Sequence, residues 1–129
     1  MRPNEISYRV IGAGMAVHAS LGPGLLESAY EKAICHEFKR GSLKFRRQVA
    51  LPVGYAGIHI SPAYRVDFIV EETIVVEIKS VDAIVSVHRA QLLSYLKLTG
   101  LPLGLMLNFK VAHLRSGIVR IINAPESEM

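Results

Sequence analysis

The chain has a single cysteine, Cys35, among its 129 residues. An internal disulfide is therefore excluded, and a zinc site built from several cysteine ligands cannot form. No apolar run approaches the roughly 20 residues that a membrane-spanning helix needs. Residues 1–10 also lack the basic and then apolar order of a signal peptide. We therefore expect a cytoplasmic protein that has no membrane partner.

Repeats, low-complexity segments and flexible linkers are also missing from the sequence. A chain of this length can build one hydrophobic core but hardly two. We predict a single domain over residues 1–124 and a disordered tail at residues 125–129. Half of the residues are apolar, which is slightly rich for a domain of this size. Some of this apolar surface is available for self-association, so a homodimer is one candidate assembly.

The formal net charge of +4 is a mild bias toward anionic partners. Its distribution is more informative, because five cations gather in one short segment: Lys39, Arg40, Lys44, Arg46 and Arg47. Such a segment can follow a phosphate backbone and bind it through counterion release. It also suits a solvated helix end followed by a loop, since cations are favoured at a helix C-terminus. The sequence leaves both interpretations open.

Charged residues interrupt the apolar segment 64–80 at Asp67, Glu77 and Lys79. Their neighbours are mostly β-branched or aromatic, which favours two strands joined at residues 71–73. A two-residue turn would place each carboxylate opposite a valine. A three-residue loop instead places Asp67 opposite Glu77 and apolar residues opposite one another, with one apolar face turned to a core. We predict this second register.

The second register brings the carboxylates of Asp67 and Glu77 to roughly 5 Å from each other, where they repel unless positive charge lies between them. Oxygen ligands of this kind suit a hard cation such as Mg²⁺. Lys79 follows on the same face of the strand and can reach the same point. A surface ladder of salt bridges that includes Arg65 would explain the same charges. Spacing alone does not decide between a cation site and this ladder.

The remaining segments alternate helical and strand patterns. We expect helices at residues 5–19, 25–40 and 87–99, and strands at residues 45–53, 56–61, 103–109 and 118–123. The order of strand 74–79, helix 87–99 and strand 103–109 fits a crossover that places the last strand parallel to the one bearing Glu77. The sequence therefore predicts an α/β fold.

Two helices carry polar residues that need an explanation. Glu27 lies in the first turn of helix 25–40, where the helix dipole favours a carboxylate, yet it shares one side of the helix with Tyr30. Gln91 and Tyr95 stand four residues apart on the mostly apolar helix 87–99. This polar stripe either lines a functional site or lies in a packing interface where its hydrogen bonds are made to other protein groups.

The run GLLESAY at residues 24–30 resembles the GxxExxY signature, which gives a family of small bacterial and archaeal proteins its name. That family is grouped with the PD-(D/E)XK nuclease-like superfamily. Segments 65–67, 77–79, 91–95 and 105–109 resemble the remaining family blocks in the same order. The proline of the superfamily motif is absent, and Val66 stands before Asp67. The resemblance covers nearly the whole chain.

This resemblance implies a restriction-endonuclease-like fold, with a mixed central β-sheet flanked by helices. It also implies metal-dependent phosphodiester hydrolysis on DNA or RNA, with Mg²⁺ or Mn²⁺ as the cofactor. The alternative is a module with the same fold that binds nucleic acid or protein without cutting. The implied roles are metal binding by Glu27, Asp67 and Glu77, orientation or activation of the attacking water by Lys79, and support of the site by Gln91, Tyr95 and Tyr30. The charge pattern adds the basic segment 39–47 as the candidate contact with nucleic acid.

Overall fold

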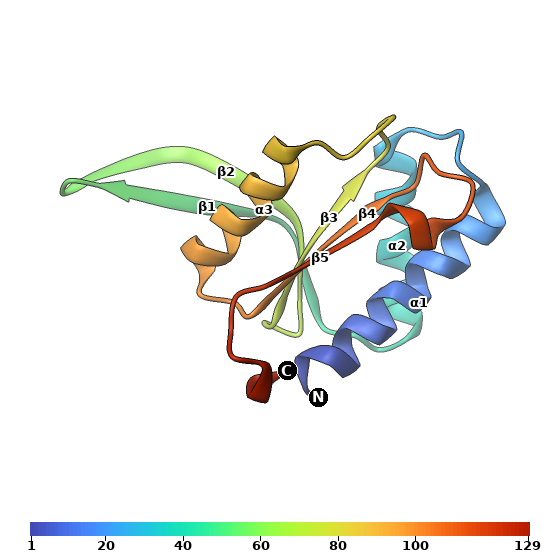
Figure 1. The fold of residues 1–129 in the computed structure, drawn as a ribbon, viewed down its shortest axis with the longest axis horizontal. Coiled ribbons are helices and arrows are strands. Elements are labelled where there is room, and N and C mark those ends of the chain that lie inside the picture. Colours follow the sequence, from blue (N-terminus) through green and yellow to red (C-terminus); the bar gives the residue numbers. More distant parts are fainter.

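The computed structural model describes the backbone of residues 1–129 and every side chain except those of Pro62 and Ala63. Its elements are shown in Figure 1. In chain order they are α1 (Pro3–Leu21), α2 (Glu27–Arg40), β1 (Phe45–Tyr55), β2 (Ile58–Val70), β3 (Ile74–Lys79), α3 (Ser86–Thr99), β4 (Leu103–Asn108), the 3-10 helix η1 (Leu114–Gly117), β5 (Ile118–Ile122) and the 3-10 helix η2 (Glu126–Glu128). The three helices agree closely with the ranges expected from the hydrophobic periodicity.

The strands form one five-stranded sheet in the order β1-β2-β3-β4-β5. Strands β3 and β4 run parallel, and every other neighbouring pair is antiparallel. The parallel pair is joined through α3, as the strand–helix–strand order in the sequence predicts. The expected α/β fold with a mixed central sheet is therefore confirmed.

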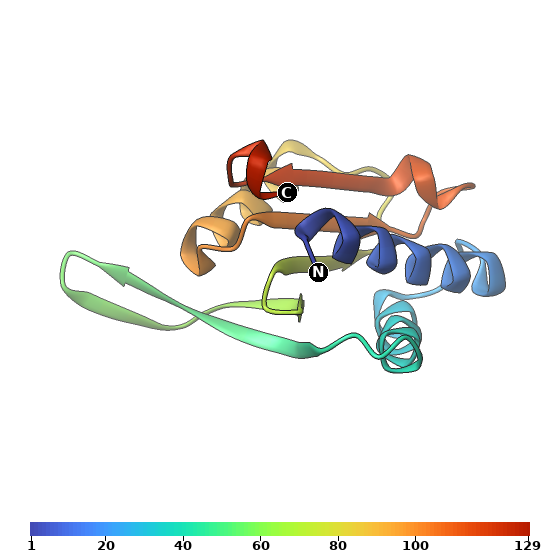
Figure 2. The ribbon, with the colours of Figure 1, turned by 90° about the horizontal axis from the view of Figure 1, so that it is seen from below.

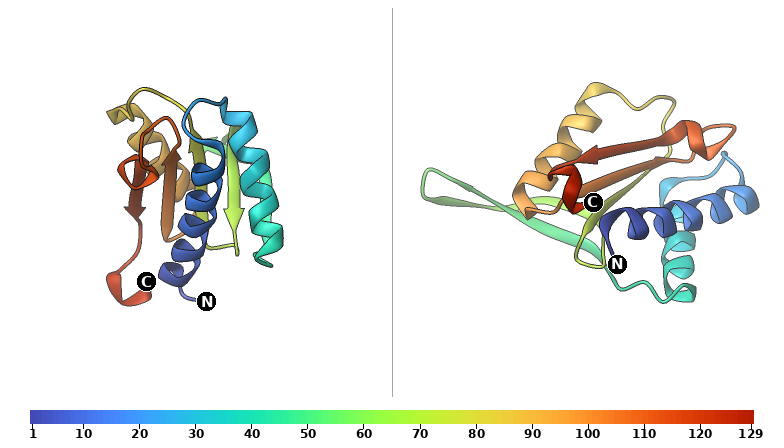
Figure 3. Two further views of the ribbon diagram at one scale, coloured as in Figure 1. Left: turned by 90° about the vertical axis from the view of Figure 1, so that its right-hand side faces the viewer. Right: turned by 60° about the horizontal axis from the view of Figure 1, so that its bottom comes forward.

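Helices cover both faces of the sheet, with α1 and α2 on one side and α3 on the other (Figure 3). In the first layer Tyr30, Ile34 and Phe38 of α2 are fully buried against the sheet. In the second layer Leu92 and Leu96 of α3 are fully buried. Strands β3 and β4 lie between the two layers, which explains why they are apolar on both faces. No helix in the described part of the chain is long and apolar enough to span a membrane.

The β1–β2 hairpin extends well beyond the rest of the sheet (Figures 1 and 2). The short strand expected at residues 56–61 is in fact the first half of β2, which continues without a break to Val70. Ala56 and Gly57 form the turn with positive φ angles of 49° and 81°, as a tight two-residue hairpin turn requires. Tyr55 and Ile58 pair beside this turn and are largely exposed. The sequence did not predict this projecting arm.

The C-terminal tail packs against the start of α1, whereas the sequence suggested a disordered tail. Met129 is buried, and its carbonyl oxygen accepts a hydrogen bond from the backbone N–H of Asn4 at 3.1 Å. The guanidinium of Arg2 donates to the carbonyl oxygen of Ser127 at 2.7 Å. These contacts join opposite ends of the sequence, which explains why local patterns did not indicate them.

Candidate active site

The predicted register of the β2–β3 hairpin is confirmed where the two strands pair. Phe68 lies opposite Val76, and Val70 lies opposite Ile74. At Asp67, the residue of β2 next to Phe68, a side-chain hydrogen bond replaces the backbone hydrogen bonds between the strands. The Oδ2 of Asp67 accepts this bond from the Ile78 N–H at 2.8 Å. A side-chain carboxylate therefore replaces a backbone acceptor at the point where the two strands separate.

Side-chain alternation along β2 breaks at the same place. Phe68 belongs to the core under α1 and α2, whereas Val66 belongs to the core under α3. The register predicts that both residues lie on the one apolar face of the hairpin, and this prediction is wrong. The neighbouring strand is also irregular here, since Gln48 has a φ of 52°, a value that non-glycine residues seldom adopt. Because of this local irregularity, side chains on either side of Asp67 do not alternate between the two faces of the sheet as they do in a regular strand.

Glu77 is the most unusual ionisable group of the site. It lies on β3 with only 6% of its surface exposed. Burial, the negative charge of Asp67 and a hydrogen bond with the Asp67 carboxyl raise the pKa of Glu77 to about 9, although the charge of Lys79 acts in the opposite direction. A buried carboxyl next to a second carboxylate holds its proton because two adjacent negative charges in a low dielectric are costly. The structure places the Asp67 carboxylate beside the peptide that follows Glu77, although the backbone pairing ends at Phe68 and Val76 and does not include Asp67 with Glu77.

Glu27 lies near Asp67 but not in a common cleft with Glu77. It is the first residue of α2 and lines a cleft of about 250 Å³ together with Asp67 and Gln48. The loop before α2 is attached to the end of β3 by a hydrogen bond from the Ser80 hydroxyl to the Leu25 carbonyl oxygen at 2.9 Å. Among the described residues, no group of three or more Asp, Glu, His or Cys side chains is arranged to hold a metal ion.

Tyr30 has a clear structural role in positioning Glu27. Its hydroxyl donates a hydrogen bond to the Gly22 carbonyl oxygen and accepts one from the Leu25 N–H. Its ring stacks on Phe109 with a centroid separation of 4.4 Å and an interplanar angle of 9°. These contacts fix the loop that leads into α2. The glutamate and tyrosine of the GLLESAY run therefore act on the same helix end.

The sequence analysis missed Gln48 and Glu31. The Gln48 amide donates hydrogen bonds to Glu31 Oε1 and, at 3.1 Å, to Asp67 Oδ1. Glu31 also binds the guanidinium of Arg47 at 2.7 Å. This chain of contacts links α2 to β2 through β1. The sequence could have indicated these contacts only through the pairing of β1 with β2. In that pairing Arg47 faces Phe68 and Val49 faces Val66, so that Gln48 lies beside Asp67.

The basic segment 39–47 carries less free charge than its composition suggests. Arg46 pairs with Glu72 at 2.7 Å, Arg47 with Glu31 at 2.7 Å, and Arg40 with Glu37 at 3.3 Å. Hydrogen bonds to Glu72 and Glu31 raise the pKa values of Arg46 and Arg47, respectively. Within the described side chains, only Lys39 and Lys44 of this segment lack a carboxylate at salt-bridge distance.

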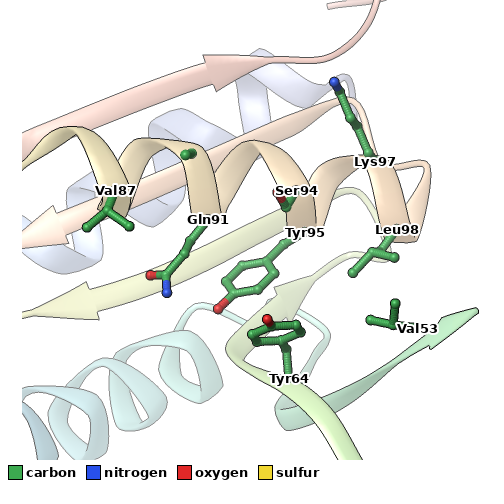
Figure 4. Close-up of a pocket in the computed structure, with 9 residues that line it drawn as sticks. Val53, Tyr64, Val87, Gln91, Ser94, Tyr95, Lys97 and Leu98 are labelled. Atoms are coloured by element: carbon green, nitrogen blue, oxygen red, sulfur yellow. The ribbon is translucent and has the colours of Figure 1, made fainter. Parts of the chain in front are cut away.

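Gln91 and Tyr95 line a groove of about 500 Å³ between α3 and the base of the β1–β2 hairpin. Figure 4 shows both side chains reaching from α3 toward Tyr64 on β2. The rings of Tyr95 and Tyr64 have centroids 5.9 Å apart. Burial raises the pKa of Tyr95, and the charges of Glu77 and Asp67 raise it further. The polar stripe of α3 therefore lines a surface next to the carboxylate pair.

The mixed sheet, the helical layers on both faces and the acidic residues on adjacent central strands define a restriction-endonuclease-like fold. A comparison with protein-family models gives a match to the PD-(D/E)XK nuclease superfamily over residues 4–121. The chain therefore belongs to this superfamily. Searches of curated proteins and of solved structures gave no match.

The contacts of Gln48 lead to a first prediction. Gln48→Ala removes the amide that orients Asp67 Oδ1. If Asp67 is a metal ligand, we expect metal affinity to fall by about 10- to 100-fold, as is usual when a group that orients a ligand is lost. Calorimetric titration with Mn²⁺ measures the affinity. Glu37→Gln is the matched control, because it removes only a partly exposed pair with Arg40. Unchanged affinity and activity in Gln48→Ala would contradict the orienting role.

Proposed function

We propose that this chain is a divalent-metal-dependent nuclease that hydrolyses phosphodiester bonds in DNA or RNA. The observation that carries the proposal is the placement of the buried Glu77 on β3 beside Asp67 on β2, whose carboxylate accepts a hydrogen bond from the N–H of Ile78, the residue after Glu77. Membership of the PD-(D/E)XK nuclease superfamily supports a nucleic-acid substrate. We further propose that the chain is of the GxxExxY type, because residues 24–30 supply both Glu27 and the tyrosine that fixes its helix.

The chemistry of the carboxylate donors suits a hard divalent cation such as Mg²⁺ or Mn²⁺. Asp67 is half-buried and Glu77 is buried on the adjacent strand. Asp67 and Glu77 would hold the cation, and Glu27, which shares a cleft with Asp67, would have to move toward Glu77 to supply a further oxygen. When bound, the cation supplies positive charge for the phosphodiester group and lowers the pKa of coordinated water.

The chain's own residues complete the chemistry. Lys79 follows Glu77 on β3 and is half-buried, and its positive charge acts on the Glu77 carboxyl. Within the described side chains it has no carboxylate at salt-bridge distance. Its ammonium group is therefore available to orient a water molecule or to donate to a phosphate oxygen, where charge develops during hydrolysis.

A nuclease assay with labelled single- and double-stranded DNA and RNA tests this function. We expect cleavage with Mg²⁺ or Mn²⁺ that chelation by EDTA abolishes. Lys79→Met should lower the rate by about 100- to 1000-fold, the usual cost of removing one stabilising donor. Lys110→Met is the control, because Lys110 is exposed and already paired with Asp82 at 2.7 Å. Absence of cleavage with either metal, together with absence of calorimetric metal binding, would refute the proposal.

A binding module without cleavage is the second candidate. Both oxygens of Asp67 already accept hydrogen bonds, one from Gln48 and one from the Ile78 N–H. A carboxylate satisfied in this way can serve a purely structural purpose. This candidate predicts affinity for nucleic acid that is unchanged in Glu77→Ala, and no cleavage by the parent protein under any metal condition.

A further inference from the structure

We propose that the groove between β2 and α3 binds an unpaired base, which makes single-stranded nucleic acid the preferred ligand of this protein. The inference deepens the proposed function and rests on it for the position of the scissile phosphate. In a duplex, bases are stacked within the helix and reach a protein pocket only after they are flipped out. A site that holds an unstacked base therefore favours single strands.

The groove offers aromatic surface that the protein leaves uncovered. Tyr64 is 51% exposed and lies beside the half-buried Tyr95. Their rings are inclined by 52° to each other, so the two residues do not form a closed stack. Val53 and Leu98 extend the apolar wall (Figure 4). Exposed aromatic rings bind bases with little regard to sequence, because every base has a π face.

The groove and the carboxylate pair share strand β2, on which Tyr64 lies three residues before Asp67. Gln91 is exposed in the same groove, and its amide can both donate and accept hydrogen bonds at a base edge. A nucleotide whose base occupies the groove would thus have its phosphate near the proposed site of hydrolysis.

One cation of the groove is not neutralised. Lys97 is among the lining residues, and within the described side chains it has no carboxylate at salt-bridge distance. Arg65 follows Tyr64 on β2 and points to the other face of the strand, where its guanidinium donates to the Gln48 carbonyl oxygen at 3.4 Å. Cations and aromatic rings occur together on surfaces that follow a single strand.

The same cation disfavours a second copy of the chain as the occupant. A two-fold interface uses the same patch on both copies, so it would bury the unpaired Lys97 of each copy in one shared interface. Like charges placed together at an interface are costly. A polyanion that also presents flat apolar rings suits both features of the groove.

Binding without metal tests the inference. We would measure fluorescence anisotropy with labelled single- and double-stranded DNA of one sequence in EDTA, and quenching of 2-aminopurine in the single strand. We expect single strands to bind at least tenfold more tightly and the probe to be quenched. Tyr64→Ala should weaken single-strand binding by about 5- to 100-fold, as expected for loss of one stacking contact.

Three further variants sharpen this test. Tyr64→Phe keeps the ring and should retain the affinity of the parent protein. Tyr55→Ala removes an exposed tyrosine outside the groove and should also bind normally. Leu98→Glu places a negative charge in the groove wall and should weaken binding, which gives an independent reading if Tyr64→Ala does not fold.

Several outcomes would overturn the inference. Equal affinity for both strand forms, normal binding by Tyr64→Ala and Leu98→Glu, or light scattering that shows these variants splitting a dimer would each do so. The proposed hydrolysis is judged separately, because the binding assay contains no metal. Cleavage with unchanged binding in Tyr64→Ala would refute the base-binding groove alone, whereas tight, Tyr64-dependent binding without any cleavage would refute hydrolysis alone.

Discussion

Asp67→Asn is expected to lower the rate of phosphodiester hydrolysis by about 1000-fold or more. An asparagine retains the size of Asp67 but loses the negative charge and one of two oxygen ligands. Stabilisation by a bound cation contributes several kcal/mol to such reactions, and each 1.36 kcal/mol changes the rate tenfold. Single-turnover assays with a labelled oligonucleotide and Mn²⁺ measure this loss directly.

The control for this experiment is Asp82→Asn. Asp82 is almost fully exposed, and its carboxylate pairs only with Lys110 among the described side chains. We expect its substitution to leave the rate unchanged. Circular dichroism must show that Asp67→Asn is folded, because the hydrogen bond from the Ile78 N–H to Asp67 also supports the hairpin. A folded Asp67→Asn protein with normal activity would exclude Asp67 from the reaction.

Glu77→Gln is expected to stabilise the metal-free protein at alkaline pH. The pKa of Glu77 is about 9 in the folded protein and 4.5 as its ordinary value. The folded state therefore holds a proton that the unfolded state releases over this interval. The stability that Glu77 contributes is complete below about pH 4.5 and falls as the pH rises toward 9, by up to about 1.4 kcal/mol per pH unit. A glutamine stays neutral and removes this decline.

Thermal unfolding between pH 5 and pH 9 in EDTA measures the effect. At pH 8 we expect Glu77→Gln to be more stable than the parent by at least about 1 kcal/mol, which corresponds to a rise in melting temperature of about 3 to 6 °C for a chain of this size. Mn²⁺ should stabilise the parent at pH 8 but stabilise the variant much less. Parallel pH profiles for the two proteins would show that Glu77 carries no raised pKa.

Local patterns in the sequence were sufficient for the helices and for the central part of the hairpin. Apolar residues at helical spacing indicated α1, α2 and α3, and the pairing of Phe68 with Val76 followed from matching apolar residues across a three-residue loop. The placement of Asp67 and Glu77 on two adjacent strands followed from that hairpin. These features depend on residues that are close in the sequence.

Features that depend on distant segments were not predicted. The contact of Gln48 with Asp67 requires the β1–β2 pairing and a positive φ at Gln48. The neutralisation of Arg47 requires α2 and β1 to lie side by side, so that Glu31 can reach it. The face that Val66 occupies changes at the same irregularity. Each of these is a tertiary outcome that alternation and spacing within one segment do not encode.

Gln48 ties the β1–β2 hairpin to the acidic pair. It lies on β1 with a left-handed φ that is uncommon for a side chain of its type. Its amide donates hydrogen bonds to Glu31 and to Asp67 Oδ1. A shift of β1 at this residue would therefore turn the Asp67 carboxylate as well, so the placement of the long hairpin and the orientation of this acidic group are coupled through one side chain.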